Sequence, residues 1–319
     1  MIQRKERPKR KIYLLLLLLP LFLRPQQIAT MEMPLQNGSI TLPGTLSYPV
    51  VESRIPLAIF VHGSGNIDRN GNQAGTGVSA NYIKALADSL NRRGIAFYRY
   101  DKRTATKTNM EISKQVVIRD FADDVKVGID HFKNDISYGP IFLIGHSQGS
   151  LVAMMAVTED VKGLISIAGP ASTMDKVLIE QISKQNPGLG KMVEQHLAEL
   201  LEKDTIADPH PFLMQLFAPQ NQKFLKNWVS LDPVMELKKI RVPVLLLNGD
   251  QDLQVSVKEA ENLKLAQPSA ELHIIPNMNH VLKEVHSLEE NKKSYYQENF
   301  PISGTLIAHL EDFIKKIDG

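Results

Sequence analysis

The stretch IFLIGHSQGSLVAMMA, residues 141–156, joins a buried strand to a helix through a very short turn. Its first four residues form an apolar run typical of a strand that is covered on both faces. The turn itself reads G-x-S-x-G, from Gly145 to Gly149, in which a strained backbone holds the serine hydroxyl exposed above the sheet. We therefore predict that Ser147 is a nucleophile. Such a residue also needs a base, an acid and donors for an oxyanion.

The composition indicates a globular protein. The chain has 319 residues, of which 43% are hydrophobic and 23% are charged. These values exclude a disordered or fibrous protein, and the length allows a large core within one α/β domain that carries an insertion.

The first 30 residues differ from the rest of the chain. The segment MIQRKERPKRK is strongly basic, and the apolar run IYLLLLLLPLFL follows it. A basic segment before a short apolar run is typical of a secretory signal. We predict a signal peptide over residues 1–30 and a secreted or periplasmic mature protein that has no contact with a membrane. The alternative is an uncleaved amino-terminal membrane anchor, because Ala29 is the only small residue that suits cleavage.

The remaining residues carry a mild negative charge. Residues 1–30 hold seven of the 37 basic residues and one of the 35 acidic residues, so their removal changes the net charge from +2 to −4. Nothing in the rest of the chain suggests a surface that binds nucleic acid. The chain has no cysteine, which excludes disulfides, a thiol nucleophile and cysteine-ligated metal sites.

Strand-like and helix-like segments alternate after residue 55. This alternation predicts a doubly wound, mostly parallel α/β sheet, built from residues 31–170 and 239–319 and covered by helices on both faces. A hairpin turn is also expected at Asn37-Gly38. The expected strands are 56–62, 95–101, 140–146, 161–169, 242–249 and 271–276, and the expected helices are 80–93, 116–133, 148–157, 256–266 and 303–317.

Residues 171–238 interrupt the alternation with helical patterns separated by prolines and glycines. Because this segment leaves and returns at strand ends, we predict a helical lid over the carboxyl edge of the sheet. Phe212, Leu213, Leu216 and Phe217 are the candidate substrate-binding residues of an acyl pocket in this lid. The alternative is a set of helices that only cover the core.

His280 is the candidate general base. A neutral imidazole suits this task near pH 7, and His280 lies four residues beyond the last expected strand, at the edge of the sheet where Ser147 also emerges. His273 lies within that strand and His286 follows six residues after His280. Either of these two fits an ordinary strand or surface residue.

Two aspartates follow the strand that ends near residue 249. Asp250 comes directly after Gly249, a position that suits a turn cap. We assign Asp252 as the acid that orients the imidazole, because the order Ser147, Asp252, His280 is that of one large group of serine hydrolases.

Two backbone N–H groups are expected to bind the oxyanion. One belongs to Gln148, directly after the nucleophile, and the other to Ser64, in the glycine-rich loop after the strand at 56–62. A plain glycine turn is the alternative for this loop. Lys102 and Arg103 suggest an anion site, but the neighbouring Asp101 makes a structural ion pair an equal alternative.

Together these segments resemble the α/β-hydrolase superfamily over residues 33–317. The resemblance is carried by HG at 62–63, RYDKR at 99–103, GHSQG at 145–149, NGDQD at 248–252 and NHVL at 279–282. The loop HGSGNIDRNG resembles that of esterases near the dienelactone-hydrolase and serine-peptidase-like branches.

The resemblance implies hydrolysis of carboxylic esters of small acyl compounds through an acyl-enzyme, with no cofactor and no metal. A serine peptidase or an acyl thioesterase with the same triad is the closer alternative. A non-catalytic binding protein of the same fold is the more distant one.

Overall fold

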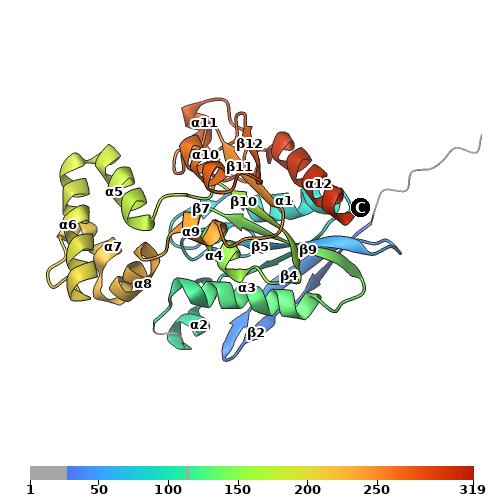
Figure 1. The fold of residues 1–319 in the computed structure, drawn as a ribbon, viewed down its shortest axis with the longest axis horizontal. Coiled ribbons are helices and arrows are strands. Elements are labelled where there is room, and N and C mark those ends of the chain that lie inside the picture. Colours follow the sequence, from blue (N-terminus) through green and yellow to red (C-terminus); the bar gives the residue numbers. More distant parts are fainter. Residues whose placement is uncertain (1–26, 113–114) are drawn as a thin grey trace, which may run out of the picture.

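The computed structural model describes residues 27–112 and 115–319. A central sheet has the strand order β1-β4-β8-β5-β9-β10-β11-β12 (Figure 1). The strands from β8 to β12 in this order are parallel, and β4 and β1 extend the sheet in antiparallel pairing. The bounds are β1 (Ile28–Glu32), β4 (Gly44–Pro49), β5 (Ile55–Val61), β8 (Ala96–Tyr100), β9 (Tyr138–His146), β10 (Val161–Ile167), β11 (Val244–Gly249) and β12 (Glu271–Ile275).

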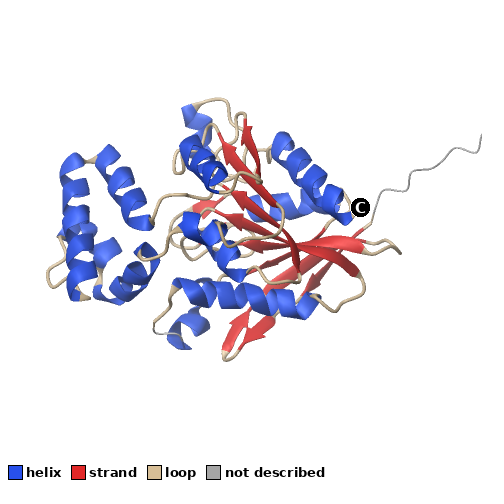
Figure 2. Ribbon diagram, in the orientation of Figure 1, coloured by secondary structure: helices blue, strands red, loops and turns tan. Residues whose placement is uncertain are grey.

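Helices cover both faces of this sheet (Figure 2). Apolar residues of α1 (Tyr82–Asn91) and α12 (Gly304–Asp318) join one hydrophobic cluster with the strands. Apolar residues of α3 (Ile118–Phe132), α4 (Gln148–Ala156), α9 (Pro233–Leu237) and α10 (Val257–Ala266) join a second cluster. The predicted doubly wound, mostly parallel sheet is confirmed.

The predicted elements agree closely with the observed ones. Each of the six expected strands and five expected helices is present, with ends shifted by two residues or fewer. The expected hairpin is formed by β2 (Leu35–Asn37) and β3 (Ile40–Leu42), and Gly38 takes a φ of +60° in its turn. Short elements complete the connections, namely β6 (Asn72–Gln73), β7 (Val78–Ser79), α2 (Lys107–Ile112) and α11 (Leu288–Lys293).

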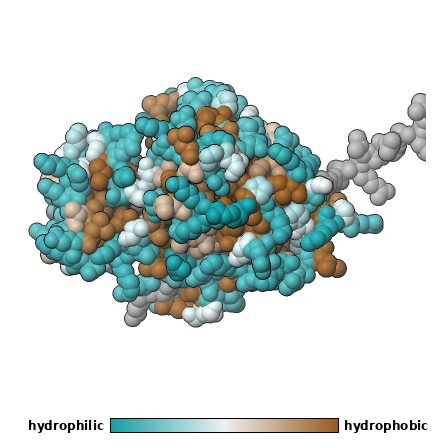
Figure 3. All heavy atoms as spheres, viewed as in Figure 1, coloured by the Kyte–Doolittle hydropathy of each residue, from teal (hydrophilic) through white to brown (hydrophobic). Residues whose placement is uncertain are grey.

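A helical segment between β10 and β11 projects from one end of the sheet (Figure 1). It contains α5 (Met174–Gln185), α6 (Pro187–Lys203), α7 (Met214–Phe217) and α8 (Pro219–Val229), which share their own hydrophobic cluster. The next helix, α9, packs on α4 and belongs to the core layer. The surface of the projecting segment mixes hydrophilic and apolar side chains (Figure 3).

The predicted signal segment lies outside the described residues except at its end. Residues 28–30 form the start of β1 and pair with β4, with Ile28 opposite Pro49 and Thr30 opposite Ser47. The predicted boundary at residue 30 therefore falls inside a strand of the main sheet. Among the described helices, none has both the length and the apolar character that crossing a membrane requires.

Candidate active site

Ser147 sits at the sharp turn between β9 and α4. Its backbone has φ 55° and ψ −124°, a conformation that residues other than glycine rarely adopt. The turn is so tight that it requires glycine at both flanking positions. A Cβ atom at Gly145 would come within 2.5 Å of the Gly149 carbonyl oxygen, and one at Gly149 within 2.1 Å of the Val61 carbonyl oxygen. Ser147 is partly exposed, whereas both of its neighbours are buried. The sequence motif therefore forms the exposed turn that it predicts.

His280 and Asp252 form a buried pair at the carboxyl edge of the sheet. His280 Nδ1 lies 2.8 Å from Asp252 Oδ2. The other oxygen of Asp252 accepts the backbone N–H groups of Gln254 and Val255, at 2.7 and 2.9 Å. Burial acts to raise the pKa of Asp252, but His280 and these N–H groups outweigh it and hold the pKa below its usual value. Ionised Asp252 thus accepts a hydrogen bond from the Nδ1–H group of His280, and in this tautomer Nε2 of His280 carries a lone pair.

Asp250 takes the turn position that the sequence suggests for it. Its Oδ1 accepts the backbone N–H of Asn277 at 2.8 Å, and the residue is exposed. The structure therefore brings Asp252 rather than Asp250 to the imidazole.

The two other candidate histidines lie apart from this pair. His273 is 2.9 Å from Glu271 and stacks on His309 with ring centroids 3.9 Å apart. His286 is largely exposed and lies beside Glu284. As the sequence analysis allowed, His273 is an ordinary strand residue and His286 an ordinary surface residue.

His146 ties the turn of Ser147 to the loop of His280. Its Nε2 lies 2.8 Å from the His280 carbonyl oxygen and therefore carries the proton. Its Nδ1 lies 3.4 Å from the Tyr82 hydroxyl, which donates to it. Burial first, and then the charge of His280, lower the pKa of His146 to about 3, so the ring stays neutral and keeps this hydrogen-bond pattern.

The glycine-rich loop after β5 approaches Ser147 closely. A Cβ atom at Gly63 would lie 3.2 Å from Ser147 Cβ, and Ser64 lines two of the cavities. Gln148 is the first residue of α4, so its backbone N–H is free of helical pairing. Ser64 and Gln148, the residues expected to supply the oxyanion donors, thus both lie close to Ser147 in the fold.

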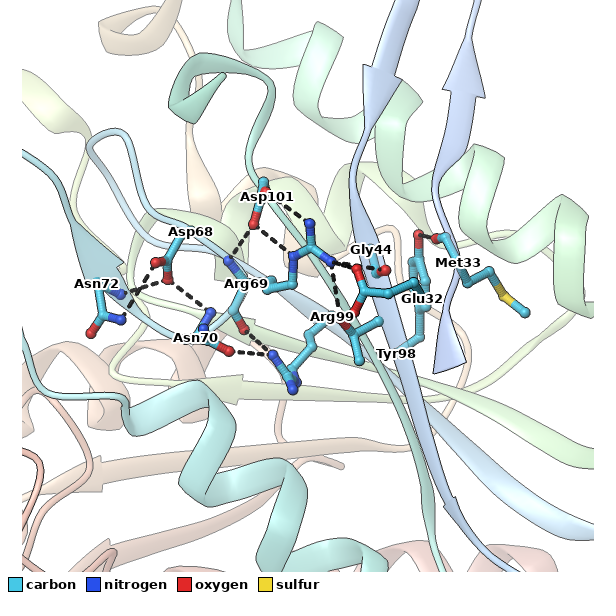
Figure 4. A network of polar contacts seen from close by, with 11 residues as sticks. Glu32, Met33, Gly44, Asp68, Arg69, Asn70, Asn72, Tyr98, Arg99 and Asp101 are labelled. Atoms are coloured by element: carbon cyan, nitrogen blue, oxygen red, sulfur yellow. Dashed lines mark hydrogen bonds and ion pairs between the residues drawn. The ribbon is translucent and has the colours of Figure 1, made fainter. Parts of the chain in front are cut away.

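Polar contacts anchor the rest of this loop, residues 64–72, to the sheet (Figure 4). Arg69 binds Asp101 through its backbone N–H, its Nε and its Nη2, at 2.9 to 3.1 Å. Arg69 also reaches Glu32 of β1 and the carbonyl oxygen of Gly44. Asp68 caps the turn by accepting the backbone N–H groups of Asn70 and Asn72.

The segment Asp101-Lys102-Arg103 makes three separate contacts. The expected ion pair of Asp101 with the adjacent Lys102 or Arg103 does not form among the described residues. Asp101 pairs instead with Arg69, and Arg103 pairs with Asp124 of α3 at 2.6 Å. Lys102 is buried and forms no ion pair with the other described residues; its Nζ lies near Gly63 and Gln148.

Two cavities lie near the turn that carries Ser147. The smaller, of about 160 Å³, is lined by Ser147, His280, Tyr82 and Tyr295 among others. The larger, of about 470 Å³, lies between the helical segment and the core, and it reaches Ser64 and Gln148. Its apolar wall consists of Met110, Val116, Phe121, Leu216, Phe224, Leu225 and Trp228. A further cavity of about 470 Å³, between α5 and the loop after β11, has neither Ser147 nor His280 in its lining.

The structure corrects the expected acyl-pocket lining. Among the described residues, Leu216 alone of the four candidates lines a cavity beside Ser147. Leu213 and Phe217 are buried in the cluster of the helical segment, and Phe212 is 82% exposed. The aromatic side chains that line the cavity are instead Phe224 and Trp228 of α8, spaced by four residues, together with Phe121 of α3. An i, i+4 aromatic pair is a signal that the sequence contains.

Comparison with known proteins defines the class. Residues 74–284 match the family model described as "Serine aminopeptidase, S33", which is well over half of the chain. The chain therefore belongs to this family of serine hydrolases with the α/β-hydrolase fold.

Individual relatives include esterases. The chain is 30% identical to Esterase EstD of Thermotoga maritima over 250 residues, which are 76% of this chain and 57% of EstD. It thus spans little more than half the length of this curated relative.

Solved structures share the fold. Est1E from Butyrivibrio proteoclasticus has a TM-score of 0.56 at 17% identity, over 89% of this chain and 98% of that one. An esterase of Pyrococcus furiosus has a TM-score of 0.57 at 16% identity, over 92% of both chains. An acylaminoacyl peptidase of Pyrococcus horikoshii has a TM-score of 0.56 at 13% identity, over 91% of this chain and 42% of that one.

Proposed function

We propose that this protein is a carboxylester hydrolase in which Ser147 is the nucleophile, His280 the general base and Asp252 the orienting acid. The observation that carries the proposal is the buried 2.8 Å contact between His280 Nδ1 and Asp252 Oδ2, with Ser147 and His280 lining one cavity. The family match and the relative EstD support it.

Acylation begins when Nε2 of His280 takes the hydroxyl proton of Ser147 as Oγ attacks the ester carbonyl carbon. The carbonyl oxygen becomes an oxyanion, which accepts hydrogen bonds from the backbone N–H groups of Ser64 and Gln148. The tetrahedral intermediate then breaks its bond to the alcohol oxygen. His280 returns the proton to that oxygen, the alcohol leaves, and the acyl group remains bound to Ser147.

Deacylation repeats these steps with water. His280 takes a proton from the water as its oxygen attacks the acyl carbon, and the same N–H groups bind the oxyanion. The bond to Ser147 Oγ breaks, His280 returns the proton to Oγ, and the carboxylic acid leaves.

The two cavities suggest how the ester lies. His280 must reach the leaving oxygen, so the cavity that it lines takes the alcohol, and a volume of about 160 Å³ suits a small alcohol. The larger cavity, on the side of Ser64 and Gln148, takes the acyl group. Its volume of about 470 Å³ and its aromatic wall suit an acyl group of moderate size. The helical segment then acts as a lid that forms one wall of the acyl site.

An aminopeptidase is the second candidate, because the matching family carries that description. Such an enzyme holds the α-ammonium group of its substrate, which a carboxylate near the nucleophile does best. The described side chains that line the two cavities beside Ser147 are all uncharged or basic. This lining favours an ester over a peptide with a free amino terminus.

Activity on a substrate panel tests the proposal. We expect p-nitrophenyl esters to be hydrolysed with a higher kcat/KM than matched thioesters and aminoacyl p-nitroanilides. A feruloyl ester belongs in the panel, since Est1E was solved with ferulic acid bound. Ser147→Ala and labelling by a fluorophosphonate show whether the activity depends on Ser147. Cleavage of the anilides with no cleavage of the esters would refute the proposal.

We also propose export of the protein, with the basic and apolar residues at the amino terminus acting as a signal. The pairing of Ile28 with Pro49 favours cleavage at or before Gln27, because cleavage at residue 30 would remove part of β1.

A further inference from the structure

Lys102 is a buried lysine whose amine contacts no carboxylate of the described residues. It is 4% exposed, and its Nζ lies 2.6 Å from the Gly63 carbonyl oxygen and 2.8 Å from Gln148 Oε1. The ring centre of Phe121 lies 4.3 Å from the same atom. The adjacent carboxylate, Asp101, is bound to Arg69 instead. Burying an amine without a paired carboxylate costs free energy, which its hydrogen bonds must offset.

The two acceptors belong to the two halves of the oxyanion site. The Gly63 carbonyl group and the Ser64 N–H group are parts of one peptide unit. Because a trans peptide is planar, its C=O and N–H point in opposite directions, so a fixed Gly63 oxygen fixes the direction of the Ser64 N–H. The second acceptor is the side chain of Gln148, whose backbone N–H is the other donor.

We propose that Lys102 is a positioning residue of the oxyanion site, which holds Gly63 and Gln148 so that the Ser64 and Gln148 N–H groups converge on the substrate oxygen. The inference rests on the proposed function. It assigns to the lysine of the DKR segment a role in the chemistry, although Lys102 itself touches no reacting atom.

Physical chemistry supports this role in two ways. Donors that are fixed before the reaction need no reorganisation as the oxyanion forms, which makes their stabilisation of the transition state effective. A hydrogen bond at the Gly63 carbonyl also polarises that peptide and strengthens the Ser64 N–H as a donor. Both the charged and the neutral amine have enough N–H groups for the two acceptors.

The competing role is recognition of a substrate anion, since Lys102 also lines the larger cavity. The Gly63 carbonyl oxygen, Gln148 Oε1 and the ring of Phe121 already contact the amine, which favours positioning over ligand binding. The two roles differ in kinetics. Positioning affects the transition state and therefore kcat, whereas anion binding affects the KM of anionic substrates.

The test compares Lys102→Met with the wild type on an uncharged p-nitrophenyl ester. We expect kcat to fall about 10- to 100-fold and KM to change less than about threefold, because loss of an oxyanion donor itself lowers kcat about 10²- to 10³-fold. A trifluoromethyl ketone, which forms an oxyanion on Ser147, should bind more weakly in proportion to kcat/KM. The matched methyl ketone, which mimics the ground state, should bind unchanged.

Asn91→Leu is the matched structural control. Asn91 is fully buried, and its Nδ2 likewise bridges two backbone carbonyl oxygens, those of Ser47 and Ile95. This variant should lose stability but keep both kcat and the ratio of the two ketone affinities. If Lys102→Met does not fold, Gln148→Leu carries the test, since it removes one acceptor and leaves the backbone N–H in place. It should lower kcat severalfold at constant KM.

A folded Lys102→Met with wild-type kcat and an unchanged ketone ratio would overturn the inference. So would a raised KM confined to anionic esters, which indicates anion binding. The ketone ratio reports on the oxyanion site for any acyl substrate, so it remains decisive if the wild type cleaves amides rather than esters. Failure of the proposed ester activity is thereby separated from failure of the role of Lys102.

Discussion

At the scale of single residues, the two aspartates after β11 separate chemistry from local structure. Asp252→Asn keeps the size of the side chain but removes the charge that holds the His280 tautomer, so we expect kcat to fall by about 10⁴ on an activated ester. Asp250→Asn should keep a near-normal kcat. Its free energy of unfolding should fall by at most about 1 kcal/mol, because the amide oxygen can still accept the Asn277 N–H.

Steady-state kinetics of both variants decide this assignment, with Ser147→Ala and His280→Ala as the inactive references. Loss of activity in Asp250→Asn together with an active Asp252→Asn would show that the acid is misassigned. Chemical denaturation of the same samples separates lost activity from lost folding.

Lys102 should also leave a signature in the pH dependence of stability. Burial lowers the pKa of its amine to about 7, whereas the unfolded chain has the ordinary lysine value near 10.4. Between these values the unfolded state binds more protons, so this residue makes the free energy of unfolding rise with pH, by up to about 1.4 kcal/mol per pH unit. Lys102→Met removes this contribution.

The measurement is the free energy of unfolding of wild type and variant from pH 7 to pH 10. The difference between the two proteins should change steadily in favour of the wild type as the pH rises. A constant difference over this range would mean that the lysine keeps its ordinary pKa in the folded protein.

The members of the predicted triad could be found from the sequence because each follows a strand end, and the carboxyl ends of parallel strands meet at one edge. The contacts of Lys102 could not. They join residues 39 and 46 positions apart in the sequence. In an irregular turn, no repeating sequence pattern indicates which way a side chain points.

At the scale of elements, α8 presents adjacent residues to two different apolar environments. Leu225 is buried in the cluster of the helical segment and also borders the larger cavity, whereas Phe224 and Trp228 line the cavity and lie partly buried against the core. The sequence predicts helices in residues 171–238. It did not show which apolar side chains face the substrate, because both sides of these helices are covered by apolar groups.

Substitution in α8 should therefore change substrate preference. Trp228→Ala enlarges the cavity, so we expect the optimum acyl length of p-nitrophenyl esters to shift toward longer chains, with the rate of fluorophosphonate labelling nearly unchanged. The profile of kcat/KM against acyl length is the readout.

Phe217→Ala is the contrasting change in the same segment. Phe217 is fully buried in the cluster of the helical segment, so its truncation should lower stability by about 3 to 5 kcal/mol if that cluster unfolds with the whole protein. The acyl-length optimum should stay in place. A shifted optimum in Phe217→Ala with no shift in Trp228→Ala would reverse the assignment of the cavity wall.

At the scale of the whole molecule, the amino-terminal strand completes the sheet. β1 pairs with β4, and Glu32 at its end binds Arg69 of the loop after β5. The sequence indicated the parallel strands well, since they are continuous apolar runs. It did not indicate β1, whose burial is partial and whose side chains give no clear alternation.

Two truncated proteins test the role of this strand. A chain that begins at Gln27 keeps β1 and should retain the stability and activity of the full chain. A chain that begins at Leu35 lacks β1 and should lose about 2 to 4 kcal/mol, since several strand hydrogen bonds contribute about 0.5 to 1.5 kcal/mol each. Equal denaturation midpoints for the two chains would show that β1 contributes little.

The backbone of Ser147 has a consequence for how this protein can evolve. A φ of 55° with ψ −124° is strained for any residue with a Cβ atom, by about 1 to 3 kcal/mol, and glycine relieves that strain. Ser147→Gly should therefore unfold at a higher denaturant concentration than Ser147→Ala, although neither has a nucleophile. Selection for thermal stability alone would enrich glycine at this position, so only continued selection for turnover would retain the serine.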